Sequence, residues 1–177
     1  MAQQQQPEAK RPKVGVGVVI HDGRGNIVMG ERAGSHGAGT LQCPGGHLEY
    51  SESFSLCAAR EALEETGLTI GNIKFLVATN DVMSAEDKHY ITIFVTAEIV
   101  GEKREPEALE PEKCAAWSWV PWSQMWAWAK AQAEAEDSGR EVQKKMFMPL
   151  VNLYRDYPEL EYALDNKLGT VSSKGDA

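Results

Sequence analysis

Glu61, Glu64 and Glu65 are the residues of this chain whose type and spacing best fit a chemical role. In a helix they would stand at i, i+3 and i+4 and would therefore crowd one face. Three carboxylates at that spacing repel one another. A hard divalent cation such as Mg2+ or Mn2+ turns the repulsion into coordination, because these ions prefer carboxylate oxygen. The spacing alone is also typical of a solvated helix face, so a metal site needs support from the neighbouring residues.

The residues around these glutamates predict the element that positions them. Residues 53–66 are expected to form a helix that ends at Gly67, a favourable C-terminal cap. Arg60 is one turn from Glu64 and is within reach of Glu52 in the preceding loop, so it is expected to hold that loop against the helix. Gly45 and Gly46 permit positive φ and close backbone approach. An apolar stripe on the helix is expected to face a core, and its residues are Leu56, Ala59 and Leu63.

Composition and charge bound the class of protein. The chain has 177 residues, 42% of them hydrophobic, which suits one domain with a substantial core. A formal charge of −8 argues against a general nucleic-acid or anionic-membrane binder, and no apolar run is long enough to cross a bilayer. Cys43, Cys57 and Cys114 are odd in number and widely spaced, which predicts neither a disulfide framework nor a zinc site. We therefore expect a cytoplasmic protein.

The apolar patterns along the chain predict an α+β fold with a mixed β-sheet. Residues 1–11 and 169–177 are expected to be mobile tails that flank one domain over residues 12–168. The predicted strands are 14–20, 26–30, 73–79, 90–100 and 115–120, and the predicted helices are 53–66, 122–135 and a last one that begins near Pro149 and ends at Tyr154.

Other motifs carry weaker signals. Gly15 and Gly17 lack the third glycine of a dinucleotide fingerprint and lie in an apolar strand, where close packing is the expected reason for them. The glycine-rich residues 30–40 fit a flexible loop and a substrate lid equally well. The five tryptophans could form a stacking box, but their spacing on one strand and one helix favours ordinary packing. They are Trp117, Trp119, Trp122, Trp126 and Trp128.

The stretch from Gly46 to Leu68 as a whole resembles the signature of the Nudix hydrolases. That signature is a glycine, five residues, a glutamate, seven residues, Arg-Glu, an apolar residue, any residue, Glu-Glu, any residue, a glycine and an apolar residue. Ala62 is the one soft match, because a larger aliphatic residue is common there. The positions that fill the pattern are Gly46, Glu52, Arg60, Glu61, Ala62, Glu64, Glu65, Gly67 and Leu68.

Outside the signature the chain resembles one MutT-like branch, the nucleotide triphosphate diphosphatases of animals and plants. The segments that carry this likeness are RPKVGVGVVI, GERAGSHGAGTLQCPGGHLEY, HYITIFVTAEIV and EPEKCAAWSWVPW, followed by FMPL at residues 147–150. Residues 123–145 depart from the branch and are interpreted as an insert, expected to be helical. The resemblance implies the Nudix fold, a mixed sheet sandwiched between helices, and a homodimer.

The same resemblance implies roles for individual residues. Glu61 and Glu65 correspond to the principal metal ligands, Glu64 to a further ligand or the group that activates water, and the Gly46 carbonyl to an extra ligand. With Glu52 and Arg60 these glutamates make up the catalytic set. The positions that correspond to the nucleotide site are Arg32, Gln42, His47 and Thr92, and Phe147 is the aromatic residue chosen for the base.

Acidic residues at two places affect the roles that the resemblance implies. Glu31 stands beside Arg32 where the branch has a basic residue, which weakens a phosphate-clamp role there. Either Glu110 or Glu112 could correspond to a glutamate that some Nudix enzymes add to the metal site from a late loop.

The function implied is a Mg2+-dependent nucleoside triphosphate pyrophosphohydrolase, with Mn2+ as a substitute. Its substrates would be purine or modified (d)NTPs, cleaved to monophosphate and pyrophosphate, with a role in nucleotide-pool sanitation. The partner expected is thus a small nucleotide rather than a membrane or a nucleic acid. The alternatives are another diphosphate substrate, such as dihydroneopterin triphosphate or a nucleotide sugar, and a noncatalytic Nudix binding module. The second is disfavoured because all four signature glutamates are present.

Overall fold

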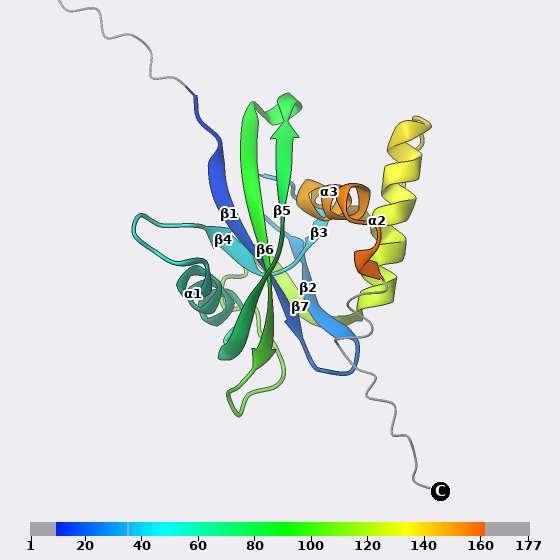
Figure 1. Cartoon of the computed structure of the whole chain (residues 1–177). Coiled ribbons are helices and arrows are strands. Elements are labelled where there is room, and N and C mark those ends of the chain that lie inside the picture. The colour runs from blue at the N-terminus through cyan, green and yellow to red at the C-terminus, as the bar shows by residue number, and fades with distance from the viewer. Residues whose placement is uncertain (1–9, 35, 162–177) are drawn as a thin grey trace, which may run out of the picture.

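Strand β1 carries the apolar run VGVGVVI through the middle of a mixed sheet that has helices on both faces (Figure 1). The computed structural model describes residues 10–34 and 36–161. The strands are β1 (Lys13–His21), β2 (Asn26–Arg32), β3 (Thr40–Gln42), β4 (Gly45–His47), β5 (Ile70–Met83), β6 (Lys88–Ile99), β7 (Cys114–Pro121) and β8 (Lys145–Met146). The helices are α1 (Phe54–Thr66), α2 (Trp122–Asp137) and α3 (Met148–Asp156), with a short 3-10 turn η1 (Ser84–Glu86).

The strand pairing makes the sheet mixed, as predicted. The main order is β5-β6-β1-β2-β3-β8, with β4 paired to β1 and β7 paired to β2. The β1–β6 and β3–β8 pairs are parallel and the others are antiparallel. β4 therefore brings the start of the glutamate-rich segment directly against the central strand.

Successive residues of β1 feed two separate cores because side chains alternate across a strand. Val18 and Ile20 lie in the core under α1, whereas Val19 lies in the core under α2 and α3. Trp122 and Trp126 of α2 are almost fully buried in the second core, which confirms packing rather than a stacking box for these two. The buried runs on both faces of β1 reflect a strand covered on both sides.

Helix α1 does not face the sheet as the sequence predicted. Its Leu56 and Leu63 are 63% and 51% exposed, while Cys57, Ala58 and Ala62 are fully buried against the sheet. α1 also lies so close to β4 that a Cβ at Gly46 would collide with the Glu61 carboxylate. Of the predicted apolar stripe only Ala59 packs against the core, so the expectation was wrong for Leu56 and Leu63, which face solvent.

The short strands β3, β4 and β8 were missed because two or three residues give no periodic signal. The predicted helix at 122–135 is confirmed, and the last helix begins with Pro149 in its first turn, as expected. The predicted tail 169–177 lies outside the described residues. Of the tail predicted at 1–11, only Lys10 and Arg11 are described, and both are exposed.

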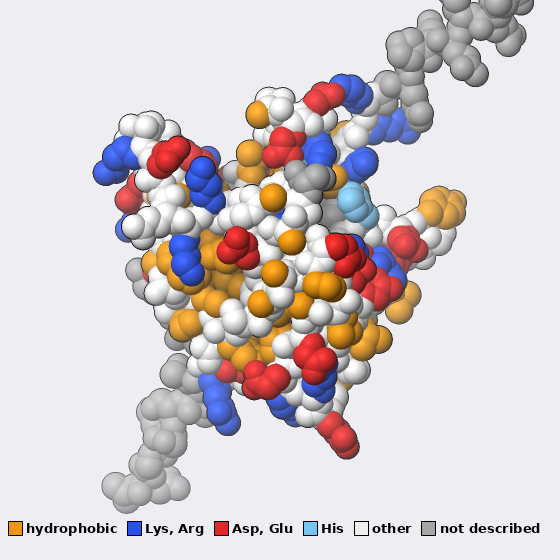
Figure 2. All heavy atoms as spheres, turned by 180° about the vertical axis from the view of Figure 1, so that it is seen from behind, with side chains coloured by type: hydrophobic (Ala, Val, Ile, Leu, Met, Phe, Trp, Pro, Cys, Tyr) orange, Lys and Arg blue, Asp and Glu red, His pale blue; other side chains and the backbone are white. Residues whose placement is uncertain are grey.

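The surface opposite the view of Figure 1 carries acidic and basic side chains interspersed around a largely uncharged centre (Figure 2). In the described part of the chain, no helix combines the length and the apolarity needed to span a membrane.

Candidate active site

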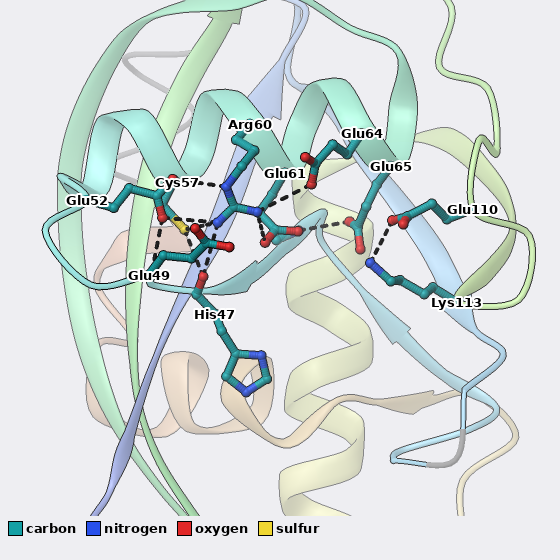
Figure 3. A network of polar contacts seen from close by, with 11 residues as sticks. His47, Glu49, Glu52, Cys57, Arg60, Glu61, Glu64, Glu65, Glu110 and Lys113 are labelled. Carbon is teal, nitrogen blue, oxygen red and sulfur yellow. Dashed lines mark hydrogen bonds and ion pairs between the residues drawn. The ribbon is translucent and has the colours of Figure 1, made fainter.

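Arg60 ties the loop before α1 to the helix itself (Figure 3). The Ser53 side chain caps α1 by accepting from the Leu56 N–H, so the helix begins just after Glu52. Arg60 donates from Nε and Nη2 to the two carboxylate oxygens of Glu52, at 3.0 Å each, and from Nη2 to the His47 carbonyl at 3.2 Å. These hydrogen bonds lower the pKa of Glu52 to about 2. The predicted Arg60–Glu52 contact is thus present.

Replacing Arg60 with alanine should lower both activity and stability. The change removes a bidentate ion pair and the donors to His47, which together hold the loop against the helix. Turnover and urea unfolding measured on the same preparation would test this. Arg60→Lys is the matched variant, because it keeps the charge but loses the planar fork and should give an intermediate loss. Loss of activity with unchanged stability would contradict the structural role.

Two of the three helix glutamates face the sheet rather than solvent. Glu61 and Glu65 are 6% and 4% exposed, whereas the Glu64 side chain is about half exposed. Glu61 accepts from Arg60 Nη1 at 2.6 Å and Glu64 accepts from the same nitrogen at 3.3 Å. Glu65 instead accepts from the Gly45 backbone N–H at 3.0 Å. Gly45 has φ 149°, one of the positive values expected of glycine at this turn.

Burial leaves Glu65 with an unusual titration. It has no ion-pair partner among the described residues, and desolvation raises its pKa to about 7. Lys113 and Glu110, which lie on its far side in Figure 3, form their own ion pair at 2.7 Å. Glu65 is therefore a carboxyl group that gains stability from a proton or from added positive charge.

The glutamates do not form a ready-made metal cluster. In residues 10–34 and 36–161, no three His, Cys, Asp or Glu side chains converge as metal ligands. Glu61 and Glu64 turn to Arg60, and Glu65 turns to Gly45. The donor set nevertheless fits a hard cation, because Glu49 and the three helix glutamates supply only oxygen to one cavity wall and the buried Glu65 has no ion-pair partner among the described residues.

These carboxylates line a cavity of about 590 Å³ whose other walls hold the predicted nucleotide residues. Arg32 ends β2 and its Nη1 donates to Gln42 Oε1 on the neighbouring strand β3. The Arg32 guanidinium lies over the Phe147 ring, with Cζ 4.3 Å from the ring centroid. Gln42 is 5% exposed. Three residues separated in sequence thus meet at one end of the cavity.

His47 and Thr92 also line this cavity, together with the backbone of Gly46. The His47 Nε2 lies 3.1 Å from the Tyr90 hydroxyl, and burial lowers the pKa of the imidazole. All eleven residues proposed from the sequence for metal, catalysis or substrate occur around one site. Of these, all but Glu52 line the cavity itself, and Glu52 is joined to it through Arg60.

Several cavity residues were not predicted from the sequence. His36 contacts the Glu86 carboxylate through Nδ1 and meets Phe147 edge-on at 5.2 Å, while its carbonyl accepts from Arg32 Nε at 2.8 Å. The glycine-rich segment is therefore held to both sides of the site near His36. Lys113 also lines the cavity. It was missed because a single lysine in a loop, directly before β7, belongs to no recognisable sequence pattern.

The two acidic positions noted in the sequence differ in their surroundings. Glu31 is exposed, and Glu112 is exposed as well. Glu110 is half-buried and lies near Glu65, where its charge contributes to raising the pKa of that residue. Of the two late-loop candidates, Glu110 is the one beside the glutamate wall.

The fold and the cavity define a class before any relative is considered, namely an α+β protein with a carboxylate-lined site beside its central sheet. Two solved structures share the fold. The MutT NUDIX hydrolase from Burkholderia pseudomallei matches with a TM-score of 0.62 at 22% identity over 81% of this chain and 97% of that one. The MutT protein from Methanosarcina mazei Go1 matches with a TM-score of 0.63 at 17% identity over 88% and 99%.

Sequence comparison identifies the family. The NUDIX domain profile matches residues 11–142. The oxidized purine nucleoside triphosphate hydrolase of Danio rerio is 34% identical over 122 residues, which cover 62% of this chain and 69% of that relative. The chain belongs to the NUDIX domain family. It is a hydrolase that acts on phosphoric anhydrides.

Proposed function

We propose that this protein is a Mg2+-dependent nucleoside triphosphate pyrophosphohydrolase, with Mn2+ able to replace Mg2+. The substrates would be purine or modified (d)NTPs, and the products a monophosphate and pyrophosphate. The observation that carries the proposal is one cavity with oxygen ligands on the α1 wall and with Arg32, Gln42 and Phe147 at the other end. The relative from Danio rerio, whose name specifies oxidized purine nucleoside triphosphates, supports the substrate class.

The glutamates of α1 would hold the cation. Glu61 and Glu65 are the proposed principal ligands, and Glu64 is a further ligand or the base. The Gly46 carbonyl is a proposed extra ligand beside Glu61. When bound, the cation supplies positive charge that neutralises the triphosphate and makes water easier to deprotonate.

The chain's own residues would do the remaining work. Arg60 lines the cavity beside Glu61 and Glu64 and holds both carboxylates by ion pairs. A glutamate carboxylate, either Glu64 or Glu65, accepts the proton of the water that attacks the β-phosphorus, and the monophosphate leaves as pyrophosphate forms.

An assay of phosphate release with added inorganic pyrophosphatase would test the proposal. It should be run over canonical, oxidised and deaminated (d)NTPs, with dihydroneopterin triphosphate and a nucleotide sugar as competing substrates. Release that depends on pyrophosphatase with a purine or modified (d)NTP is the expected result, and such a product pattern would be consistent with nucleotide-pool sanitation. Turnover confined to the other compounds, or none with any of them, would contradict the proposal. The homodimer implied by the resemblance stays a prediction for light scattering.

Phe147→Ala should raise KM for purine triphosphates. Arg32 covers one face of the Phe147 ring, and we place the base on the opposite face. Loss of a base-aromatic stack costs about 1–3 kcal/mol, which corresponds to roughly a tenfold to hundredfold rise in KM. Hydrolysis of bare triphosphate should change little, because it has no base.

Phe75→Ala is the matched control for this variant, since Phe75 is an exposed phenylalanine on β5, outside the cavity. It should leave KM unaltered. An unchanged purine KM in folded Phe147→Ala would place the base elsewhere.

A further inference from the structure

A row of four neighbouring residues crosses the floor of the cavity. The strand registers pair Thr79 of β5 with Thr92 of β6, Thr92 with Gly15 of β1, and Gly15 with His47 of β4. Thr92 and Gly15 both line the cavity, whereas Thr79 does not. The side chain missing at Gly15 leaves the Thr92 hydroxyl uncovered on that side, because a Cβ there would lie 4.0 Å from Thr92 Oγ1.

Close packing therefore explains Gly17 but not Gly15. A Cβ at Gly17 would lie 2.9 Å from the Phe94 ring, which is too near for a carbon contact. A Cβ at Gly15 would meet only Thr92 Oγ1 at 4.0 Å and the Gly46 carbonyl at 3.7 Å, which are ordinary distances. The expectation of close packing was correct for Gly17 and wrong for Gly15, where the glycine keeps the cavity floor open.

Beneath this floor lies Asp81, a fully buried acid that the proposed chemistry does not use. Its Oδ2 accepts from Thr92 Oγ1 at 2.5 Å and from Thr79 Oγ1 at 3.1 Å, and its Oδ1 accepts from Asn152 Nδ2 of α3 at 2.8 Å. Within the described residues no basic side chain forms an ion pair with it. Three donors around one carboxyl match a carboxylate that only accepts.

Asp81 thereby sets the polarity of the Thr92 hydroxyl. A hydroxyl has one proton and two lone pairs, and the proton of Thr92 is directed at Asp81. Only lone pairs are left for the cavity, so Thr92 offers an acceptor to a ligand. The phosphate and carbonyl oxygens of a ligand are also acceptors, so they cannot form a hydrogen bond with these lone pairs. The matching group is a donor.

The place of Thr92 indicates which donor this is. Gly15 alone separates Thr92 from His47 in the strand register, so Thr92 lies near the wall proposed for the phosphates, while Phe147 and Pro149 line the cavity where α3 begins. In a nucleotide the group between phosphates and base is the sugar, whose hydroxyls are donors. The position and the polarity of Thr92 therefore agree on one part of the substrate.

We propose that Asp81 is a positioning residue that fixes the Thr92 hydroxyl as the acceptor for a sugar hydroxyl of the nucleotide. The assignment rests on the proposed function for the identity of the ligand. Because Asn152 bonds the other oxygen of Asp81, it also connects this sugar contact to α3, the helix that follows Phe147. Asp81, through Thr92, thus determines selectivity for the sugar.

Binding of product nucleotides tests the proposal without turnover. The dissociation constants of a purine nucleoside monophosphate in its ribo, 2′-deoxy and 2′,3′-dideoxy forms would be measured by calorimetry in EDTA. The wild type should lose about tenfold in affinity when the contacted hydroxyl is removed. A loss at the first step identifies the 2′-hydroxyl and a loss at the second identifies the 3′-hydroxyl.

Three variants should abolish this discrimination by different routes. Thr92→Val removes the acceptor. Asp81→Ala leaves Thr92 in place but removes the oxygen that accepts from it, so that the Thr92 hydroxyl proton is free to turn into the cavity. Gly15→Ala covers the Thr92 hydroxyl while leaving Asp81 and its partners in place. The added methyl group would make only ordinary van der Waals contacts, so this variant should fold. It therefore keeps the test valid if the Asp81 variant unfolds.

Thr79→Val is the matched control. Thr79 donates to the same Asp81 oxygen as Thr92 and is also buried, but it lies outside the cavity. It should lose stability as Thr92→Val does and keep the discrimination. Equal affinity of the wild type for all three sugars, or full discrimination in folded Thr92→Val and Gly15→Ala, would overturn the proposal. Discriminating binding without any triphosphate hydrolysis would overturn the proposed function and leave this assignment standing.

Discussion

Removing divalent cations with EDTA is expected to abolish triphosphate hydrolysis, and Mg2+ or Mn2+ is expected to restore it. The reason is the donor set, because Glu61, Glu64 and Glu65 offer only carboxylate oxygen to the cavity. Arg60 forms ion pairs with Glu61 and Glu64 but not with Glu65. Zinc should not serve as a structural ion. Activity would be followed as pyrophosphate release in buffer with EDTA, then with each metal in excess.

The same chelated sample should remain folded. Both cores are built from apolar side chains on the two faces of the sheet and neither depends on the glutamate wall. Circular dichroism and thermal unfolding with and without EDTA would show this. A sample that unfolds on chelation, or that hydrolyses triphosphate at an unchanged rate in EDTA, would contradict the proposed metal role.

Glu65→Gln is expected to cut turnover by roughly 100-fold or more, because it removes a proposed metal ligand rather than a packing group. The amide keeps the size of the side chain and can still accept from the Gly45 N–H, so packing is preserved. Glu134→Gln makes the same chemical change on the exposed side of α2 and should have no effect. Near-normal turnover of Glu65→Gln at saturating Mg2+ would exclude the assigned role.

The metal-free stability of this variant should differ from wild type in a pH-dependent way. The pKa of Glu65 is about 7 in the folded protein against an ordinary 4.5, so between these values only the unfolded chain releases the proton. Wild-type stability therefore falls as pH rises through this window. The full penalty, on the order of 3 kcal/mol, is present above pH 7 and absent below 4.5.

Urea unfolding of both proteins in EDTA at pH 5 and pH 8 would measure this difference. Glu65→Gln should be the more stable protein at pH 8, and most of its advantage should vanish at pH 5. Added Mg2+ should stabilise the wild type more than the variant at pH 8. A pH-independent difference would mean that Glu65 is not held neutral by burial.

Short-range features of the site were readable from the sequence because they depend on spacing along one helix. Arg60 is one turn from Glu64 and Gly67 follows the last helical residue, so local geometry placed both. The helix begins at Phe54, one residue later than predicted, with Ser53 as its N-cap. Strands β1 and β2 were likewise predicted from runs of apolar residues. The signature added the family and the roles of the individual glutamates as metal ligands by resemblance alone.

The direction in which α1 faces could not be predicted in this way. A helix with Leu56 and Leu63 on one side and glutamates on the other is ordinarily packed through the leucines. Here the site lies between the helix and β4, so Glu61 and Glu65 have to face the sheet beside Ala58 and Ala62. The close packing of α1 on β4 therefore overrides the hydrophobic pattern of the helix.

By itself the sequence determined the glutamate helix, its C-terminal cap at Gly67, the central strands and the Nudix family. Each of these depends on neighbours within a few residues or on a fixed motif. Only the tertiary structure decided which distant groups share the cavity. His36 meets Phe147, and Asp81 meets both Thr92 and Asn152, across separations that carry no periodic signal. Strand register and helix docking set these contacts. Such non-local pairing is a property of the folded sheet, not of any segment of the chain.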